Sequence, residues 1–169
     1  MFPSDTTYPT LRVGIIGCGE VAQVIHVPAL GFLSELFSVT YLCDVSQQAL
    51  DFTKTRVMGS SNVRTTRNPT ELCGSPDVDV VFVLSSDEYH ADHAIMALSQ
   101  HKHVMIEKPA ALNFRDLARI QQAEDASRGR VMVGYMRRYA AAFEQAIKEV
   151  GGLDQVLYAR VRGRGSHPT

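Results

Sequence analysis

The sequence predicts an α/β protein built on a doubly wound parallel sheet. Two observations carry this prediction: short apolar runs alternate with amphipathic segments, and a glycine-rich turn joins the first run to the helical pattern behind it. The runs are apolar on both faces, as strands covered by helices on either side require. The predicted strands are Leu11–Ile16, Ser38–Cys43, Val78–Leu84, His103–Ile106 and Val131–Val133.

Helical patterns lie between these strands. One spans Glu88–Ser99 and repeats apolar residues at i, i+3, i+4 and i+7, which a helix places on one face. Another spans Ser46–Arg56. A further helix starts near Glu20 and is expected to break at Pro28, because proline removes an N–H and clashes inside a helix. The apolar face of the first pattern consists of Ala91, Ala94, Ile95 and Leu98.

Two more segments complete the predicted domain. The pattern over Asn113–Ser127 predicts a helix with Asn113 as a favourable N-cap. Residues 59–76 are turn-rich, with a short strand at Val63 and a short helix after Pro69. The face of the Asn113–Ser127 helix expected to meet the core consists of Phe114, Leu117, Ala118 and Gln121.

Composition and charge exclude several classes of protein. The 169 residues carry 17 basic and 18 acidic side chains, so no charge excess recruits nucleic acid. No apolar run approaches the roughly 20 residues of a membrane span, and the N-terminus lacks the features of a signal peptide. Cys18, Cys43 and Cys73 form an odd set without CxxC spacing, which argues against a disulfide framework or a zinc site. We therefore expect a cytoplasmic protein with no metal, nucleic-acid or membrane partner.

A glycine-rich loop follows the first strand. Residues 17–22 form a GxGxxA motif that opens the next helix. Gly17 permits the tight turn, Gly19 leaves room for a pyrophosphate, and Ala22 allows close packing of helix on strand. The helix N-terminus then offers free N–H groups to the phosphates. In this context the motif predicts a Rossmann domain that binds a dinucleotide through Gly17, Cys18, Gly19, Glu20 and Val21.

Asp44 is the predicted partner of the adenine ribose. It ends the second strand, 25 residues after Gly19, where an acid accepts hydrogen bonds from the ribose hydroxyls. A carboxylate repels a 2′-phosphate, so NAD is favoured over NADP, although Ser46 beside it can serve an NADP site. The alternative interpretation is a glycine turn in an unrelated α/β protein, with Asp44 capping the following helix.

Further motifs follow in order across almost the whole chain. Residues 26–30 (HVPAL) resemble an HxPAL motif, residues 85–90 (SSDEYH) resemble TPNxxH, and residues 107–109 match EKP. Residues 134–139 (GYMRRY) resemble a segment that leads out of a nucleotide domain. Together with the glycine loop and Asp44, these segments resemble the Gfo/Idh/MocA family, the glucose–fructose oxidoreductase and inositol dehydrogenase group. The resemblance implies an oxidoreductase that uses NAD(P).

The resemblance assigns the chemistry to the segment after the strand His103–Ile106. It implies that Lys108 binds substrate and cofactor and transfers the proton, and that Glu107 contacts the cofactor or positions Lys108. Both residues end a strand, at the edge of a doubly wound sheet where ligands bind. Pro109 is expected to fix the backbone after Lys108, with a cis bond as one means. Spacing alone instead favours a surface Glu–Lys pair that closes a strand.

The segment after the third long strand departs from the family pattern. Ser85, Ser86 and Asp87 stand where the family has Thr-Pro-Asn, so an acid replaces an amide beside the expected nicotinamide ribose. The resemblance makes Ser85, Asp87 and His90 cofactor-side residues. His90 and His93 lie three apart on a predicted helix, which allows a metal site, but a helix cap by Asp87 and ordinary helix histidines are favoured.

The pattern changes after Gly134, and this predicts two parts. Residues 1–134 are expected to form the NAD(P)-binding domain. Residues 135–169 are expected to hold a linking helix over Ala140–Val150 and a strand over Val156–Arg162 that needs a partner. The resemblance implies a second α/β domain with the substrate pocket and a DxxxH histidine. No DxxxH follows Tyr158, so we expect a truncated second domain.

Three functions compete at this stage. The leading one is an NAD(P)-dependent oxidoreductase whose full-length relatives move hydride between the cofactor and a secondary alcohol of a sugar or polyol. The alternative is a truncated NAD(P)-binding module or sensor without catalysis, which the missing second domain favours for this chain alone. A methyltransferase that uses S-adenosylmethionine also has a glycine loop and an acid after the second strand, but the EKP and HxPAL segments argue against it. An oligomer is possible, because family members associate through the second domain.

Overall fold

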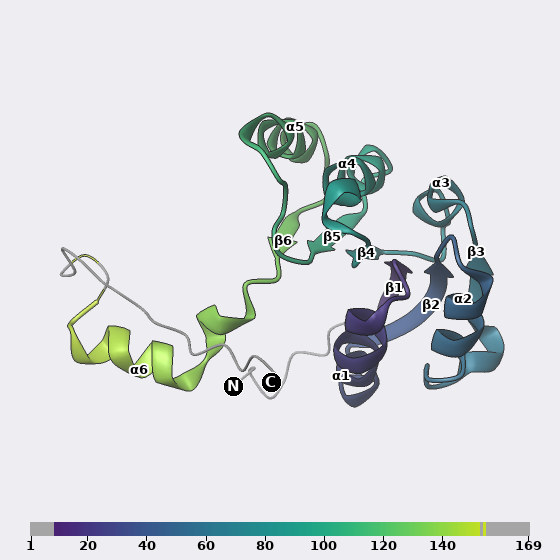
Figure 1. The fold of residues 1–169 in the computed structure, drawn as a ribbon, viewed down its shortest axis with the longest axis horizontal. Helices are drawn as coiled ribbons and strands as arrows, with labels where there is room; N and C mark the ends of the chain where they lie inside the picture. The colour runs from purple at the N-terminus through teal and green to yellow at the C-terminus, as the bar shows by residue number, and fades with distance from the viewer. Residues whose placement is uncertain (1–8, 153, 155–169) are drawn as a thin grey trace, which may run out of the picture. The chain divides into compact units, whose positions relative to one another are not determined.

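The computed structural model describes residues 9–152 and 154, and a parallel sheet of six strands organises those up to Gly134 (Figure 1). Its order is β3-β2-β1-β4-β5-β6, and every neighbouring pair is parallel. This order confirms the predicted doubly wound fold. Successive strands are added on one side of β1 up to β3 and on its other side from β4 onward. The strands are β1 (Leu11–Ile16), β2 (Phe37–Cys43), β3 (Arg64–Thr66), β4 (Val80–Val83), β5 (His103–Ile106) and β6 (Val131–Val133).

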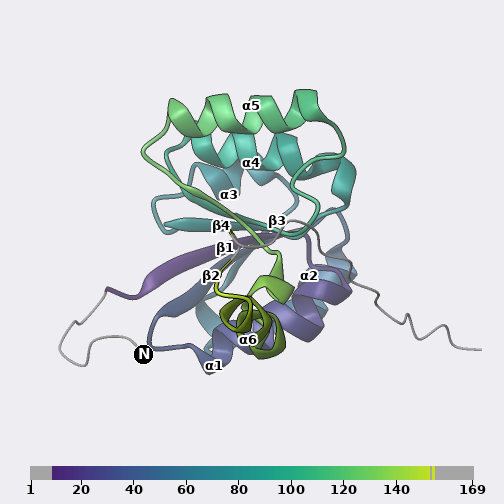
Figure 2. The same cartoon turned by 90° about the vertical axis from the view of Figure 1, so that its left-hand side faces the viewer.

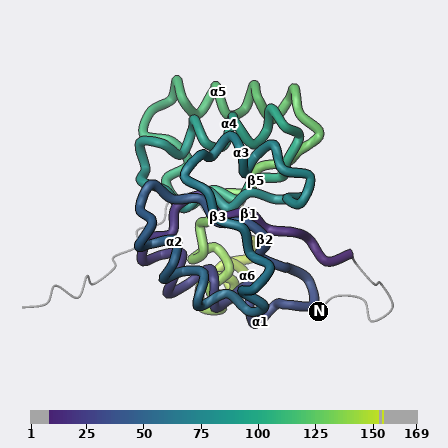
Figure 3. The backbone as a smooth tube through the Cα atoms, turned by 90° about the vertical axis from the view of Figure 1, so that its right-hand side faces the viewer, coloured from purple at the N-terminus to yellow at the C-terminus, as the bar shows by residue number. Residues whose placement is uncertain are grey.

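Helices cover both faces of the sheet. In Figure 2, α3, α4 and α5 lie above the strands, and α1 and α2 lie below them; Figure 3 shows the same layers from the opposite side. Each layer buries its own apolar cluster against the sheet, one around Leu72 and Leu98 and the other around Leu30 and Leu50. The helical segments of this part are η1 (Ala22–His26), α1 (Val27–Phe32), α2 (Gln47–Lys54), η2 (Ser60–Asn62), α3 (Pro69–Cys73), η3 (Asp87–Tyr89), α4 (His90–Ser99) and α5 (Phe114–Asp125).

Most predicted elements are confirmed with small shifts at their ends. Three of the strands, β1, β5 and β6, have the predicted bounds, and β4 is shorter than the apolar run that contains it. The short strand expected at Val63 begins one residue later. The predicted apolar face of α4 is buried or half-buried along its length. Asn113 is the N-cap of α5, because its Oδ1 accepts the Asp116 N–H at 2.9 Å.

The prediction that the first helix breaks at Pro28 is wrong. The backbone stays right-handed helical from Val21 through Val27. Residues Ala22–His26 form a wider π-type turn, in which the Val27 N–H bonds to the Ala22 carbonyl. Pro28 then occupies the first turn of α1, where a missing N–H costs little. The register change thus lets the helical path continue past the proline.

The predicted core face of α5 is also wrong. Phe114 is 90% exposed and Leu117 is 45% exposed, whereas Ile120 is the buried residue of this helix. α5 packs against α4, and the side that carries Ile120 is the one that meets the apolar cluster. Phe114 opens the helix at an exposed end, so its hydrophobicity does not report burial.

A second compact unit starts at Tyr135. Its described part holds η4 (Met136–Tyr139) and α6 (Ala141–Glu149), which corresponds to the predicted linking helix. The strand predicted over 156–162 lies outside the described residues. Across the described part of the chain, none of the helices combines the length and apolar character that crossing a membrane requires.

Candidate functional site

The two glycines of the loop after β1 lie in different structural surroundings. Gly17 has a φ of +96°, and a Cβ there would lie 2.5 Å from the backbone of Leu84 and Ser85. Only glycine fits this left-handed, crowded position. A Cβ on Gly19, by contrast, would meet no protein atom within 4 Å. The open space over Gly19, at the start of a helical segment, fits a phosphate group held against the backbone.

Cys18, between these glycines, is fixed by burial of its side chain and by hydrogen bonds to its carbonyl oxygen. Its side chain is fully buried, and burial raises the pKa of its thiol to about 12, with the Asp44 charge adding to the effect. Its carbonyl accepts hydrogen bonds from Gln23 Nε2 at 2.7 Å and Thr53 Oγ1 at 3.3 Å. Cys18 therefore stiffens the loop and offers no reactive thiol. Glu20 and Val21, which follow the glycines, are exposed.

Asp44 ties the glycine loop to the end of β2. Its Oδ2 accepts the Cys18 N–H at 2.7 Å, and its Oδ1 accepts the Ser46 N–H at 2.8 Å. The N-cap of α2 is Ser46, whose hydroxyl accepts the Ala49 N–H. Each Asp44 oxygen keeps a lone pair, because a carboxylate oxygen accepts two hydrogen bonds. The carboxylate therefore both braces the loop and retains acceptors for hydroxyl groups.

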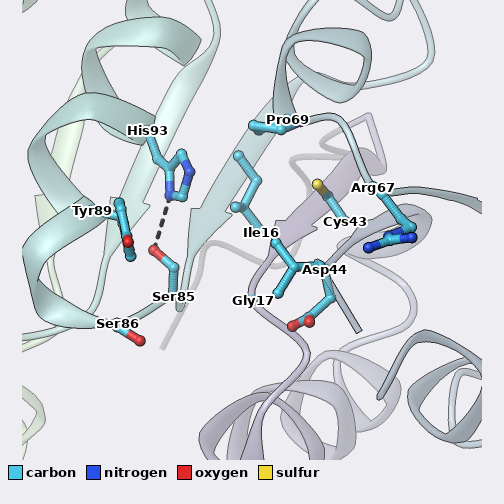
Figure 4. A pocket seen from close by; sticks show the side chains of 11 residues that line it. Ile16, Gly17, Cys43, Asp44, Arg67, Pro69, Ser85, Ser86, Tyr89 and His93 are labelled. Carbon is cyan, nitrogen blue, oxygen red and sulfur yellow. Dashed lines mark hydrogen bonds between the residues drawn. The ribbon is translucent and has the colours of Figure 1, made fainter. Parts of the chain in front are cut away.

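A pocket of about 430 Å³ lies at the carboxyl ends of β1, β2 and β4 (Figure 4). This is the point at which strand order reverses, where open α/β sheets bind ligands. On one side, Ser85 Oγ lies 2.9 Å from His93 Nδ1, and the His93 ring pairs with the Tyr89 ring. Burial lowers the pKa of His93, which favours its neutral ring. The lining residues are Ile16, Gly17, Cys43, Asp44, Val45, Arg67, Pro69, Ser85, Ser86, Tyr89 and His93.

The predicted residues of the β4 loop separate in the structure. Ser85 lines the pocket, and Asp87 lies exposed at the start of η3. His90 is only 1% exposed and is not among the lining residues. Its Nε2 lies 2.8 Å from the Ser85 carbonyl and its Nδ1 2.7 Å from the Pro109 carbonyl. His90 thus joins the loops after β4 and β5 instead of facing the pocket.

The loop after β5 contains a further histidine contact. Glu107 Oε1 pairs with His26 Nε2 at 2.9 Å, and Glu107 Oε2 accepts the Lys108 N–H at 3.0 Å. Lys108 itself is exposed, and the Lys108–Pro109 peptide bond is cis. Both oxygens of Glu107 are therefore engaged by other groups of the protein, one by the His26 ring and one by the Lys108 backbone.

His26 is the residue that sequence reasoning missed. It lies in the HVPAL segment at the end of the π-type turn, is largely buried, and packs edge-on against Phe82. The HxPAL motif marked the position, but nothing in the sequence connected it with a glutamate 81 residues away. π-type turns recur at functional sites, and this one carries the histidine that contacts the Glu107 side chain.

Comparisons with known proteins identify the family of this chain. Residues 11–135 match the model of an oxidoreductase family with an NAD-binding Rossmann fold, Gfo/Idh/MocA. Inositol 2-dehydrogenase 3 of Saccharopolyspora erythraea is 36% identical over 156 residues, covering 89% of this chain and 44% of that protein. Inositol 2-dehydrogenase of Salmonella typhimurium is 33% identical over 162 residues, covering 92% of this chain and 46% of that protein. The chain thus spans about half the length of these relatives.

Solved structures share the fold. The structure of myo-inositol dehydrogenase from Lactobacillus casei, in complex with NAD(H) and myo-inositol, superposes with a TM-score of 0.76 and 26% identity, covering 85% of this chain and 42% of that one. A probable dehydrogenase from Thermotoga maritima superposes with a TM-score of 0.72 and 29% identity, covering 83% of this chain and 40% of that one. Motifs, strand order, pocket and relatives agree, and the chain belongs to the Gfo/Idh/MocA oxidoreductase family, with an NAD-binding Rossmann domain over residues 11–135.

Proposed function

We propose that this chain supplies the cofactor half of a dehydrogenase that acts on a secondary alcohol of a cyclic polyol or sugar. The observation that carries the proposal is the meeting of three features at the carboxyl edge of one sheet. The glycine loop follows β1, the pocket lies at the ends of β1, β2 and β4, and the Glu107–Lys108 pair follows β5. In this proposal a dinucleotide lies along this edge, with one part in the pocket and its nicotinamide end beside Lys108.

In this proposal, different residues bind different parts of the cofactor. The backbone around Gly19, with Glu20 and Val21, receives the pyrophosphate. Asp44 accepts the adenine-ribose hydroxyls through its remaining lone pairs, which favours NAD over NADP. The hydroxyl of Ser85 and the carboxylate of Asp87 serve the nicotinamide half.

Lys108 exchanges the proton of the substrate hydroxyl. When bound, NAD⁺ would supply the acceptor for the hydride that leaves the carbinol carbon. The hydroxyl proton passes to the Lys108 amine, and the carbon–oxygen single bond becomes a ketone. Glu107 fixes the backbone beside Lys108, since it accepts the Lys108 N–H while it pairs with His26. The reverse sequence of proton and hydride transfers reduces a ketone.

The substrate class comes from the relatives, several of which are named inositol 2-dehydrogenases. We further propose that residues 1–134 form the cofactor domain and that the residues from 135 on belong to the part that contacts substrate and other subunits. Because the chain spans about half of each relative, we expect the chain alone to bind cofactor and to turn over polyols weakly or not at all.

Titration of the full chain with NADH, followed by fluorescence or calorimetry, tests the proposal. We expect saturable binding that Gly19→Val weakens at least about tenfold, because its side chain fills the space over the loop. Gly31→Ala is the control, since a Cβ there makes ordinary contact with Met58. Binding of S-adenosylmethionine without NADH binding would refute the proposal.

Turnover separates the enzyme from the cofactor-binding module. With NAD⁺ and myo-inositol, a slow turnover that Lys108→Ala abolishes while NADH binding persists supports the catalytic role of Lys108. NADH binding with no turnover by the wild-type chain supports the module.

A further inference from the structure

His90 is buried between two loops of the site, and within the described residues each of its ring nitrogens has a backbone carbonyl oxygen as its hydrogen-bond partner. Its side chain is 1% exposed. The Nδ1 atom lies 2.7 Å from the Pro109 carbonyl oxygen, and the Nε2 atom lies 2.8 Å from the Ser85 carbonyl oxygen. Both distances are those of good hydrogen bonds.

The two carbonyl contacts indicate which nitrogens of the His90 ring carry a hydrogen. A carbonyl oxygen has no hydrogen to donate, and a neutral imidazole carries a hydrogen on one nitrogen only. In either neutral tautomer, one ring lone pair would face a carbonyl lone pair at hydrogen-bond distance. Both contacts are hydrogen bonds only when both ring nitrogens carry hydrogen, which is the imidazolium.

We propose that His90 is an imidazolium in the folded chain and acts as a positioning residue that latches the Lys108–Pro109 segment to the loop lining the cofactor pocket. The assignment of the charged ring depends on geometry alone, whereas the consequence for the cofactor rests on the proposed function. Ser85 lines the pocket, and Pro109 directly follows Lys108. One ring therefore sets the separation between the two segments that the cofactor must bridge.

The surroundings agree with a single buried cation. The titratable side chains around His90 on its own helix are Asp87, Glu88, Tyr89, Asp92 and His93, and those on the β5 loop are Glu107 and Lys108. On α5, which packs against this helix, Arg119 pairs with Asp92 and Asp116. Within the described residues, no carboxylate forms an ion pair with the ring, so the two carbonyls provide its stabilisation. His93 is the complementary case: burial lowers its pKa, the nearby Asp92 opposes this, and the proximity of His90 lowers it further.

The protonation of the ring is measured directly by nitrogen NMR. The full chain is labelled with ¹⁵N in its histidines, and His90 is assigned through its backbone connectivity. We expect two protonated ring nitrogens at pH 6.5, because both ring nitrogens face carbonyl oxygens. A single protonated nitrogen at pH 6.5 in the folded, cofactor-free chain overturns the proposal.

Cofactor affinity tests the latch. His90→Gln offers an amide that cannot donate to both carbonyls, so we expect the Kd for NADH at pH 7 to rise about tenfold, the effect of losing one charge-assisted hydrogen bond. The part of the pH dependence of NADH affinity that comes from this ring should be present in the wild-type chain and should vanish in the variant. His103→Gln, which removes an exposed ring, is the matched control.

The outcomes separate the two proposals. A folded His90→Gln chain with the wild-type Kd and pH profile overturns the latch. If that variant does not fold, the ring spectrum and pH profile of the wild-type chain decide. NADH binding with a neutral His90 rejects the inference and keeps the proposed function, and a charged His90 without NADH binding keeps the charged ring and rejects the proposed function.

Discussion

Replacement of Asp44 by asparagine tests how the glycine loop is held. The Asp44 carboxylate accepts two backbone N–H groups, one from Cys18 at 2.7 Å and one from Ser46 at 2.8 Å. Asparagine has one acceptor oxygen, and its amide group would face the other N–H donor. A hydrogen bond to a charged group contributes about 1.5–3 kcal/mol, and one such bond is lost, so we expect Asp44→Asn to lower the free energy of unfolding by about this amount.

Urea unfolding followed by circular dichroism measures this loss. Asp51→Asn is the matched control, because Asp51 is exposed on α2 and its carboxylate has one hydrogen-bond donor among the described residues, the Gln47 side chain. A surface change of this kind alters stability by no more than about 0.5 kcal/mol. Equal unfolding midpoints for Asp44→Asn and Asp51→Asn would show that the carboxylate does not brace the loop. NADH affinity, measured on the same samples, should fall in the Asp44 variant alone.

Three further predictions use other parts of the domain. Gly17→Ala should destabilise the chain by several kcal/mol, because its φ of +96° and the 2.5 Å approach of the Ser85 backbone leave no room for a methyl group, and wild-type thermal stability would contradict this. The Arg12 hydrogen bond holds the pKa of Asp79 below its usual value. The ionised Asp79 therefore stabilises the folded state at neutral pH, and this contribution is lost as the pH falls below about 4. Asp79→Asn should reduce the loss of unfolding free energy on acidification in that range. Burial lowers the pKa of His93, so the folded state resists its protonation and stability should rise with pH up to about 6.5; His93→Gln should remove this slope in urea midpoints measured from pH 5 to 7.

Local pattern was enough for most of the fold. Strands apolar on both faces and turns with clear caps require no knowledge of distant partners, and β1 and the Asn113 cap show this. Predictions from the local sequence pattern were wrong where contacts within the folded domain outweighed local preference. Pro28 was expected to stop a helix, yet a π-type turn upstream shifted the register so that the proline fell in a first turn. Phe114 was expected in the core but opens α5 at an exposed end.

The site divides in a similar way. Spacing alone was enough to propose the glycine loop and Asp44 as cofactor contacts, because a phosphate turn and a strand-end acid are local features that one stretch of chain specifies. The partners of Glu107 and His90 were not found, since His26 lies 81 residues from Glu107 and the Pro109 carbonyl lies 19 residues from His90.

The sequence by itself therefore determined the fold class, the family and the position of the glycine loop. The tertiary structure decided which side chains brace the loops, that His90 faces two carbonyls instead of the pocket, and that Cys18 is sealed in the core. The physical reason is the distance along the chain over which each interaction acts. Turn conformation and hydrophobic period act over a few residues, whereas hydrogen-bond partners and burial exist only after the parallel strands bring distant segments to the same edge of the sheet.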